Sequence, residues 1–122
     1  MRVQSTPAAP HPEMPYPALV GQVIKYFRTN AGIDQGTMAA YLELSQSAYS
    51  RIESGDTVVN VWQLRKCCEA LGSSPSQVLS EVQFREEQLQ AQGVEIVPEK
   101  RTNPGAALIG IAILAALLAS GG

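Results

Sequence analysis

The sequence has little of the chemistry that enzymes and metal proteins use. Its 122 residues include one histidine, His11, and two cysteines, Cys67 and Cys68, which are adjacent. Adjacent cysteines rarely form a disulfide bond with each other, and no second pair is present. We therefore expect no disulfide framework, no zinc site and no cofactor, in a protein of the reducing cytoplasm. The sequence has no nucleophile–base set and no glycine-rich phosphate loop, so we also expect that it is not an enzyme.

The chain lacks a large excess of either charge. Nine lysine and arginine residues stand against eleven aspartate and glutamate residues, which gives a net charge of −2. Such a chain cannot bind nucleic acid through bulk positive charge alone, although the balance leaves room for one polar or basic face. The length suits one domain with appendages and is too short for two full domains.

Proline is concentrated at the N-terminal end, where residues 1–17 hold five of the eight prolines. Such a stretch cannot sustain a helix or a regular strand ladder, so we predict a disordered arm over residues 1–17. The spacing of its prolines also permits a second interpretation, a ligand for a proline-recognition domain. The arm lacks the apolar run of a secretion signal.

From residue 18 to about residue 80, apolar residues recur every three or four positions, which predicts five short helices and an all-α fold. The fifth helix is expected to extend to about residue 92. Residues 94–97 have the composition of one brief strand, but they have no obvious partner. The residues that cap or end these helices are Asp34, Ser45, Asn60 and Ser74 at the starts and Gly32, Gly55 and Gly72 at the ends.

The C-terminal part predicts a linker over residues 93–104 and a separate helix over residues 105–120. Residues 105–119 contain no charged side chain. A helix that is apolar on every side must be buried all round or lie in lipid, and about 17 residues is the lower limit for spanning a bilayer. Lys100 and Arg101 would keep its first end in the cytoplasm. We therefore expect a tail anchor at the inner face of the cytoplasmic membrane, or alternatively a helix buried in an oligomer or on a partner protein.

The second and third predicted helices carry the functional prediction. Two short helices joined by a three-residue turn are the geometry that sets the second helix into the DNA major groove. Amide, hydroxyl and guanidinium groups hydrogen-bond base edges and phosphates. On the helix expected over residues 46–54, the polar face that carries such groups consists of Gln46, Ser47, Ser50 and Arg51.

The segment from Ile33 to Gly55 resembles the Cro/cI-repressor-like (XRE) helix-turn-helix family, and the likeness covers residues 18–80, about half of the chain. The resemblance implies a five-helix domain that binds double-stranded DNA as a dimer and regulates transcription. It also implies a buried ion pair between Arg28 and Glu53 and a phosphate contact by Gln35. The full set of DNA-contacting residues implied in this way is Gln35, Ser45, Gln46, Ser47, Tyr49, Ser50 and Arg51.

Some features depart from the family pattern. Glu43 stands at a turn position where many members have glycine, and a left-handed conformation there costs about 1 kcal/mol. Residues 18–79 contain five basic and five acidic side chains, so we expect modest and strongly salt-dependent DNA affinity for one protomer. Trp62 is either a partly buried rim residue or a dimer contact. The alternative function is a membrane-tethered adaptor that uses the same domain to bind a cytoskeletal or signalling protein.

Overall fold

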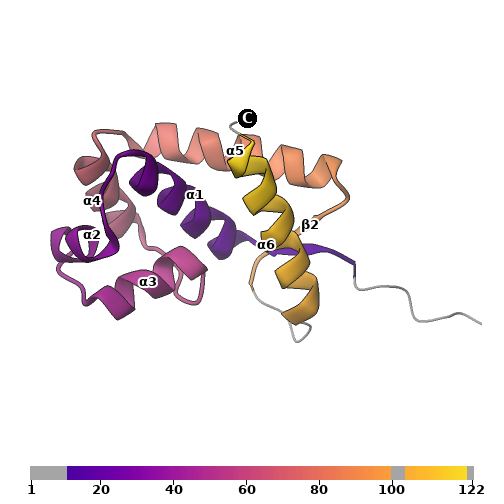
Figure 1. Ribbon diagram of the computed structural model, residues 1–122, viewed down its shortest axis with the longest axis horizontal. Helices are drawn as coiled ribbons and strands as arrows, with labels where there is room; N and C mark the ends of the chain where they lie inside the picture. The colour runs from indigo at the N-terminus through magenta and orange to yellow at the C-terminus, as the bar shows by residue number, and fades with distance from the viewer. Residues whose placement is uncertain (1–10, 100–103, 121–122) are drawn as a thin grey trace, which may run out of the picture.

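The computed structural model describes residues 11–99 and 104–120, which form six helices and two short strands. α1 lies at the centre, with α2, α3 and α4 at one end of the molecule and α6 and the strands at the other (Figure 1). The expected disorder of residues 1–10 lies outside the described residues. The elements are β1 (Glu13–Pro15), α1 (Tyr16–Asn30), α2 (Gln35–Tyr41), α3 (Gln46–Ser54), α4 (Val61–Leu71), α5 (Pro75–Ala91), β2 (Glu95–Val97) and α6 (Pro104–Ala119).

The first five helices begin and end close to the residues that the sequence indicates. The Asp34 carboxylate accepts a hydrogen bond from the Thr37 amide at 2.7 Å, and the Ser45 hydroxyl accepts one from the Ala48 amide at 3.1 Å. These bonds satisfy amide groups that the first turn of a helix leaves without partners. The same role falls to Asn60 at the start of α4 and to Ser74 at the start of α5.

The N-terminal segment is not wholly an arm, because β1 pairs in parallel with β2. The Glu95 amide donates to the Pro12 carbonyl oxygen at 2.9 Å. Proline is tolerated in β1 because an edge strand does not need every backbone N–H group for pairing. The predicted arm and linker are therefore corrected in their described parts: α1 begins at Tyr16, and the brief strand of residues 95–97 has a partner.

α6 is a helix, as predicted, but it is not separate from the domain. It packs against β1, α1 and α5, and its Leu114 is fully buried in the same core as Met14 of β1. Gly110 lies so close to β1 that a Cβ atom there would be 1.9 Å from the Glu13 carbonyl oxygen. The opposite side of α6, which includes Leu108, is exposed. None of the helices within residues 11–99 and 104–120 combines the length and hydropathy that crossing a membrane requires.

A buried arginine joins α5 to α6. Arg85 is only 1 % exposed, and its guanidinium donates to Glu81 Oε2 at 2.5 Å and to Gln88 Oε1 at 2.8 Å. Its Nη1 also donates to the Leu117 carbonyl oxygen at 3.4 Å, near the C-terminal end of α6. Because carbonyl groups at a helix C-terminus attract cations, this contact favours the docked position of α6.

The substitution Gly110→Ala tests whether α6 is docked on β1. The new methyl group would meet backbone atoms of Glu13, so we expect a loss of about 1–3 kcal/mol in the free energy of unfolding, measured by urea denaturation. Gly36→Ala in α2 is the matched control. A Cβ atom at position 36 would make only ordinary van der Waals contacts, and alanine favours a helix over glycine. Equal stability of the two variants would contradict the docked position.

Candidate nucleic-acid interface

α2 and α3 are joined by a tight turn that fixes their relative direction. Glu43 adopts the left-handed conformation with a φ of 59°, at the position where the family pattern has glycine. The Leu44 amide donates to the Ala39 carbonyl oxygen at 2.9 Å, which closes the turn. Ala39 is buried, and its small side chain lets the two helices approach each other. This is the helix-turn-helix geometry that the sequence predicts.

The inner face of α3 lies directly on α1. A Cβ atom at Gly21 of α1 would be 2.2 Å from a carbonyl oxygen of α3, so only glycine permits this approach. One residue further along α1, Gln22 donates from Nε2 to the Glu53 carbonyl oxygen at 2.9 Å. The backbone of α1 is therefore in direct contact with the C-terminal half of α3. This contact leaves little freedom for α3 to rotate.

A buried carboxylate connects α1, α2 and α3. Arg28 of α1 contacts Glu53 of α3 through two nitrogens, with Nε 2.6 Å from Oε2 and Nη2 3.1 Å from Oε1. Gln35, the first residue of α2, donates from Nε2 to Oε1 at 2.9 Å, and the Tyr49 hydroxyl donates to Oε2 at 2.5 Å. Arg28 also donates from Nη1 to the Ile33 carbonyl oxygen at 2.8 Å. These donors replace the water that Glu53 loses on burial.

The surroundings of this cluster keep each of its titratable groups in the protonation state that its hydrogen bonds require. Burial raises the pKa of Glu53, but hydrogen bonds from Arg28, Tyr49 and Gln35 lower it further, so the pKa lies below its ordinary value. The hydrogen bond to Glu53 raises the pKa of Arg28, which keeps its positive charge. Burial and the neighbouring Glu53 raise the pKa of Tyr49, so the phenol stays protonated and donates.

The outer face of α3 is polar and lies at the surface. Gln46, Ser47 and Arg51 are exposed, and Ser50 is half-buried. The side-chain oxygen of Gln46 lies 3.7 Å from the position that a Cβ atom would take at Gly36, so the first turns of α2 and α3 adjoin. The face therefore offers amide, hydroxyl and guanidinium groups close to two helix starts, a combination that suits base edges and phosphates.

The structure places one residue of the predicted DNA-binding set, Tyr49, away from the outer face of α3. Tyr49 is fully buried and donates to Glu53, so it belongs to the core cluster and not to the outer face. Its position four residues before Glu53 turns both side chains to the same inner side of α3. Gln35 is half-buried and uses its amide nitrogen on Glu53. Ser45 is exposed, and its hydroxyl accepts from the Ala48 amide as a helix cap.

The sequence analysis expects the Arg28–Glu53 pair between α1 and α3, but it misses the contacts that Gly21 and Gln22 of α1 make with α3. A glycine inside a helical pattern signals close approach of another backbone, so Gly21 carries a readable signal. Gln22 carries no such signal, because a glutamine on a helix is ordinarily a solvated side chain.

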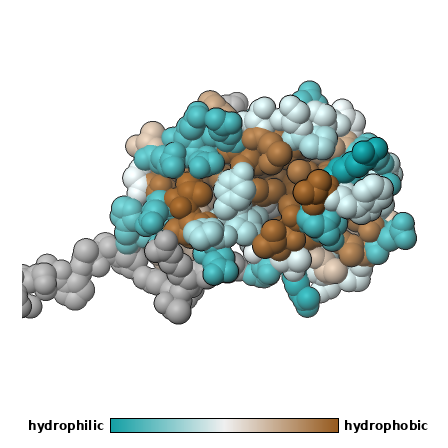
Figure 2. Space-filling model, turned by 180° about the vertical axis from the view of Figure 1, so that it is seen from behind, coloured by the Kyte–Doolittle hydropathy of each residue, from teal (hydrophilic) through white to brown (hydrophobic). Residues whose placement is uncertain are grey.

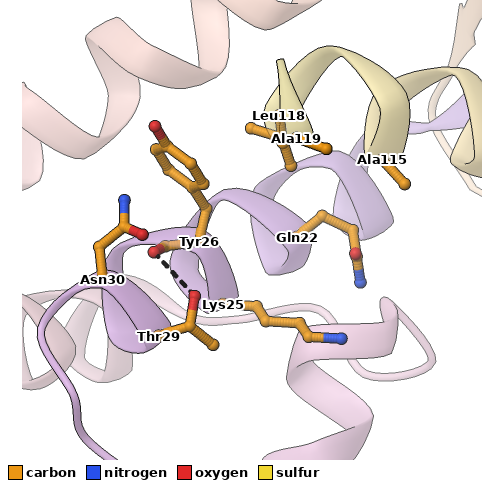
Figure 3. A pocket seen from close by; sticks show the side chains of 8 residues that line it. All are labelled: Gln22, Lys25, Tyr26, Thr29, Asn30, Ala115, Leu118 and Ala119. Carbon is orange, nitrogen blue, oxygen red and sulfur yellow. Dashed lines mark hydrogen bonds between the residues drawn. The ribbon is translucent and has the colours of Figure 1, made fainter. Parts of the chain in front are cut away.

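An open groove of about 320 Å³ lies between α1 and α6 (Figure 3). The Thr29 hydroxyl in its wall donates to the Tyr26 carbonyl oxygen at 3.2 Å. Two alanines and a leucine of α6 form the other wall, and we assign no chemistry to this groove. Within residues 11–99 and 104–120, no three His, Cys, Asp or Glu side chains are grouped in a way that could hold a metal ion. The groove is lined by Gln22, Lys25, Tyr26, Thr29, Asn30, Ala115, Leu118 and Ala119.

Comparison with protein families agrees with this geometry. A family model described as helix-turn-helix matches residues 24–78, which run from the middle of α1 to the first turn of α5. This match agrees with the resemblance of residues 18–80 to the Cro/cI-like helix-turn-helix family. The match ends before most of α5 and does not include β1, β2 or α6, so it covers the elements around α3 and not the terminal segments.

Solved structures similar to this helix-turn-helix protein include the clp gene regulator ClgR from Corynebacterium glutamicum. The identity is 28 % and the TM-score is 0.63, and the alignment covers 66 % of this chain and 86 % of that chain. A second ClgR structure from C. glutamicum also has 28 % identity, with a TM-score of 0.56 over 59 % of this chain and 94 % of that chain. A search of the curated proteins finds no match.

Arg28→Met tests the ion pair that supports α3. The substitution leaves Glu53 buried without its cation, and we expect a loss of about 3–5 kcal/mol in the free energy of unfolding. Arg65→Met is the matched control, because Arg65 is exposed and its pair with Glu69 should contribute about 1 kcal/mol or less. Thermal and urea denaturation give the comparison, and equal losses in the two variants would refute a structural role for the buried pair.

The pH dependence of stability tests the carboxylate itself. Because the pKa of folded Glu53 lies below its ordinary value, its contribution to stability is complete above about pH 5–6 and is lost as the pH falls through the folded pKa. Wild type should therefore lose more stability between pH 7 and pH 3 than Glu53→Gln does, as measured by urea denaturation at each pH. Parallel losses in the two proteins would mean that other carboxylates cause the decline.

Proposed function

We propose that this protein is a transcriptional regulator that binds double-stranded DNA with the outer face of α3. The observation that carries the proposal is the contrast between the two faces of this helix. The outer face exposes Gln46, Ser47 and Arg51, while the inner face is held on α1 by the Glu53 cluster. The major groove of DNA admits one α-helix, and a rigid helix loses little freedom on entering it. The helix-turn-helix match and the likeness to the ClgR regulator support the same function.

The side chains of this surface divide into base-reading and phosphate-binding groups. Gln46, at the start of α3, has the amide that pairs with adenine, and Arg51 has the guanidinium that pairs with guanine or a phosphate. Ser45, Ser47 and Ser50 lie along the same side and suit phosphate oxygens or base edges. Gln35 would contact a phosphate by sharing its amide between the DNA and Glu53. Such contacts position the domain without selecting a sequence.

We propose further that the protein acts in the cytoplasm as a homodimer on a partly palindromic site. The domain has balanced charge over residues 18–79, so one protomer gains little from the phosphate backbone. Two joined domains reach two half-sites, which lie about 34 Å apart when they are separated by one turn of DNA. We assign α6 to the domain itself and not to a membrane tether, because Leu114 lies in its core.

An adaptor that binds another protein is the second candidate function. The observation that favours it is the apolar loop after α3, where Val58 is exposed in place of a basic or amide residue. The two functions differ in a simple measurement, because only a DNA-binding protein shows salt-dependent affinity for duplex DNA.

Gln46→Ala tests the base-reading role. Selection from random DNA with the full chain identifies a preferred site, and the variant should lose about 1–3 kcal/mol of binding free energy there and little on random DNA. Gln83→Ala, an exposed glutamine of α5, is the matched control and should bind as wild type does. Fluorescence anisotropy at several salt concentrations measures both. If wild type has no preferred site and no salt-dependent binding, the adaptor function replaces this proposal.

A further inference from the structure

One side of α6 forms a continuous apolar strip on the surface. α6 buries Ala106 and Leu114 against the domain, while Leu108 is 66 % exposed and Ile109 is 39 % exposed. The exposed residues recur every three or four positions, so they lie on one side of the helix along its length. We call this surface the α6 strip; its residues are Leu108, Ile109, Ala112, Ala115, Ala116 and Ala119.

The α6 strip contains no polar side chain, because residues 105–119 consist only of glycine, alanine, leucine and isoleucine. On the face of the molecule opposite α6, by contrast, apolar residues reach the surface between hydrophilic ones (Figure 2). Exposed apolar side chains that are scattered singly are ordinary, whereas a contiguous apolar surface marks an interaction site. We therefore expect the strip to contact a partner.

A positive charge borders the α6 strip. Ala115 and Ala119 form part of one wall of the open groove between α1 and α6, and the exposed Lys25 of α1 lies on the opposite wall (Figure 3). Among the described residues, no aspartate or glutamate lines this groove. A lysine can lay its apolar stem along such a surface and place its ammonium group beside an anion. The edge of the strip therefore offers a charge that suits a phosphate group.

The area of the α6 strip indicates which kind of partner it fits. The helix has 16 residues, so one face of it is about 24 Å long and 10 Å wide and offers on the order of 250 Å². A stable protein complex buries about 800 Å² on each partner, and the strip has no polar side chain that would fix the orientation of one. A lipid surface sets neither requirement. An apolar helix face enters the boundary between headgroups and acyl chains to a depth of about 5–10 Å, and its binding strength scales with the apolar area.

We propose that the α6 strip is a lipid-contact surface, which lies in the interface of a phospholipid bilayer while α6 stays docked in the core. The domain beneath α6 supplies the polar side that an isolated interfacial helix has to carry itself. Lys25 then meets lipid phosphates at the edge of the contact. The contact is peripheral and leaves Leu114 buried, so it differs from the spanning anchor that the sequence analysis expects.

This inference goes beyond the proposed function and is compatible with it. α2 and α3 lie at the opposite end of the molecule from α6 (Figure 1). A bilayer against the α6 strip therefore leaves the outer face of α3 uncovered, and one molecule can contact lipid and DNA at the same time.

Flotation of the full chain with vesicles of equal parts phosphatidylcholine and phosphatidylglycerol tests the lipid contact. We expect wild type to float with the vesicles. Leu108→Glu should raise the apparent lipid dissociation constant at least about tenfold, because it places a charge in the apolar contact. Position 108 is exposed, so the circular dichroism spectrum should not change. Val61→Glu is the matched control, because it places the same charge on an 84 % exposed side chain of α4 and should float as wild type does.

Three results of this experiment would overturn the proposal. Wild type could stay in the vesicle-free fraction, Leu108→Glu could float as wild type does, or the two variants could lose the same affinity. If wild type does not float and Leu108→Glu lowers its native mass in sedimentation velocity, the strip is a contact between copies of the chain instead.

Charge reversal tests the place of Lys25 at the edge of the contact. The chain has a net charge of −2, so the apolar strip and not bulk charge has to provide the affinity. Lys25→Glu should raise the apparent lipid dissociation constant at least about fivefold, because a basic side chain near an anionic surface favours binding. Arg65→Glu makes the same change of charge at an exposed position of α4 and is the matched control. Equal losses in the two variants would contradict the proposed orientation.

Tryptophan emission tests which face meets the vesicles. Trp62 of α4 is the only tryptophan, and its emission should not change when vesicles are added to wild type. In the double variant Trp62→Phe, Ala112→Trp, the indole lies on the α6 strip, and its emission should shift to shorter wavelength on the same vesicles. A shift in wild type without one in the double variant would mean that α4 contacts the lipid. Either that result or an unshifted double variant that floats would contradict the proposal.

Amide hydrogen–deuterium exchange of the vesicle-bound protein tests whether α6 stays docked. The Glu95 amide donates to the Pro12 carbonyl oxygen within the strand pair that α6 packs against. We expect this amide to exchange no faster on vesicles than in free protein. Faster exchange would show that α6 has left the core and would overturn the peripheral contact. DNA is absent from these measurements, so their failure is distinct from failure of DNA binding, which the anisotropy of wild type measures.

Discussion

The buried pair of Arg28 and Glu53 is the interaction on which the rest of the helix-turn-helix domain depends. A carboxylate inside a protein is costly unless hydrogen bonds replace its water, and here α1, α2 and α3 itself each supply a donor. The position of α3 is therefore specified by three helices at once. Its outer face can be entirely polar because the inner face contributes the packing. The charged pair also selects one orientation of α3, since a rotated helix would leave Glu53 buried without partners.

The terminal segments form a second set of contacts at the opposite end of the molecule from α2–α4 (Figure 1). β1 pairs with β2, α6 covers β1, and Arg85 connects α5 to the last turn of α6. These elements enclose the ends of α1 and α5 and place Leu114 in the common core. The apolar C-terminal helix is thus part of the folded domain. The polar outer face of α3 and the closure of the core by α6 therefore fall on separate parts of the chain.

Local signals in the sequence were enough for α1 to α5, because caps such as Asp34 and Ser45 and the helical spacing of apolar residues act within a few positions. The family resemblance supplied the expectation of the Arg28–Glu53 pair. The strand pair could not be predicted, because β1 has three residues that include a proline and its partner is 82 positions away. The docking of α6 was also hidden, since a helix that is apolar on all sides does not indicate which side is buried. Arg85 and Glu81 have the spacing of an ordinary surface pair, and only the position of α6 makes Arg85 a core residue.

The central claim is that α3 and the start of α2 form the DNA-binding face. Amide hydrogen–deuterium exchange of the full chain, with and without a duplex that carries its preferred site, tests this claim most directly. The first amides of a helix lack partners within the helix and exchange readily, so bound phosphates and bases should slow them. We predict slower exchange at residues 34–37 and 45–51 and no change in α6. Slower exchange confined to α4, α5 or α6 on a bound duplex would contradict the account.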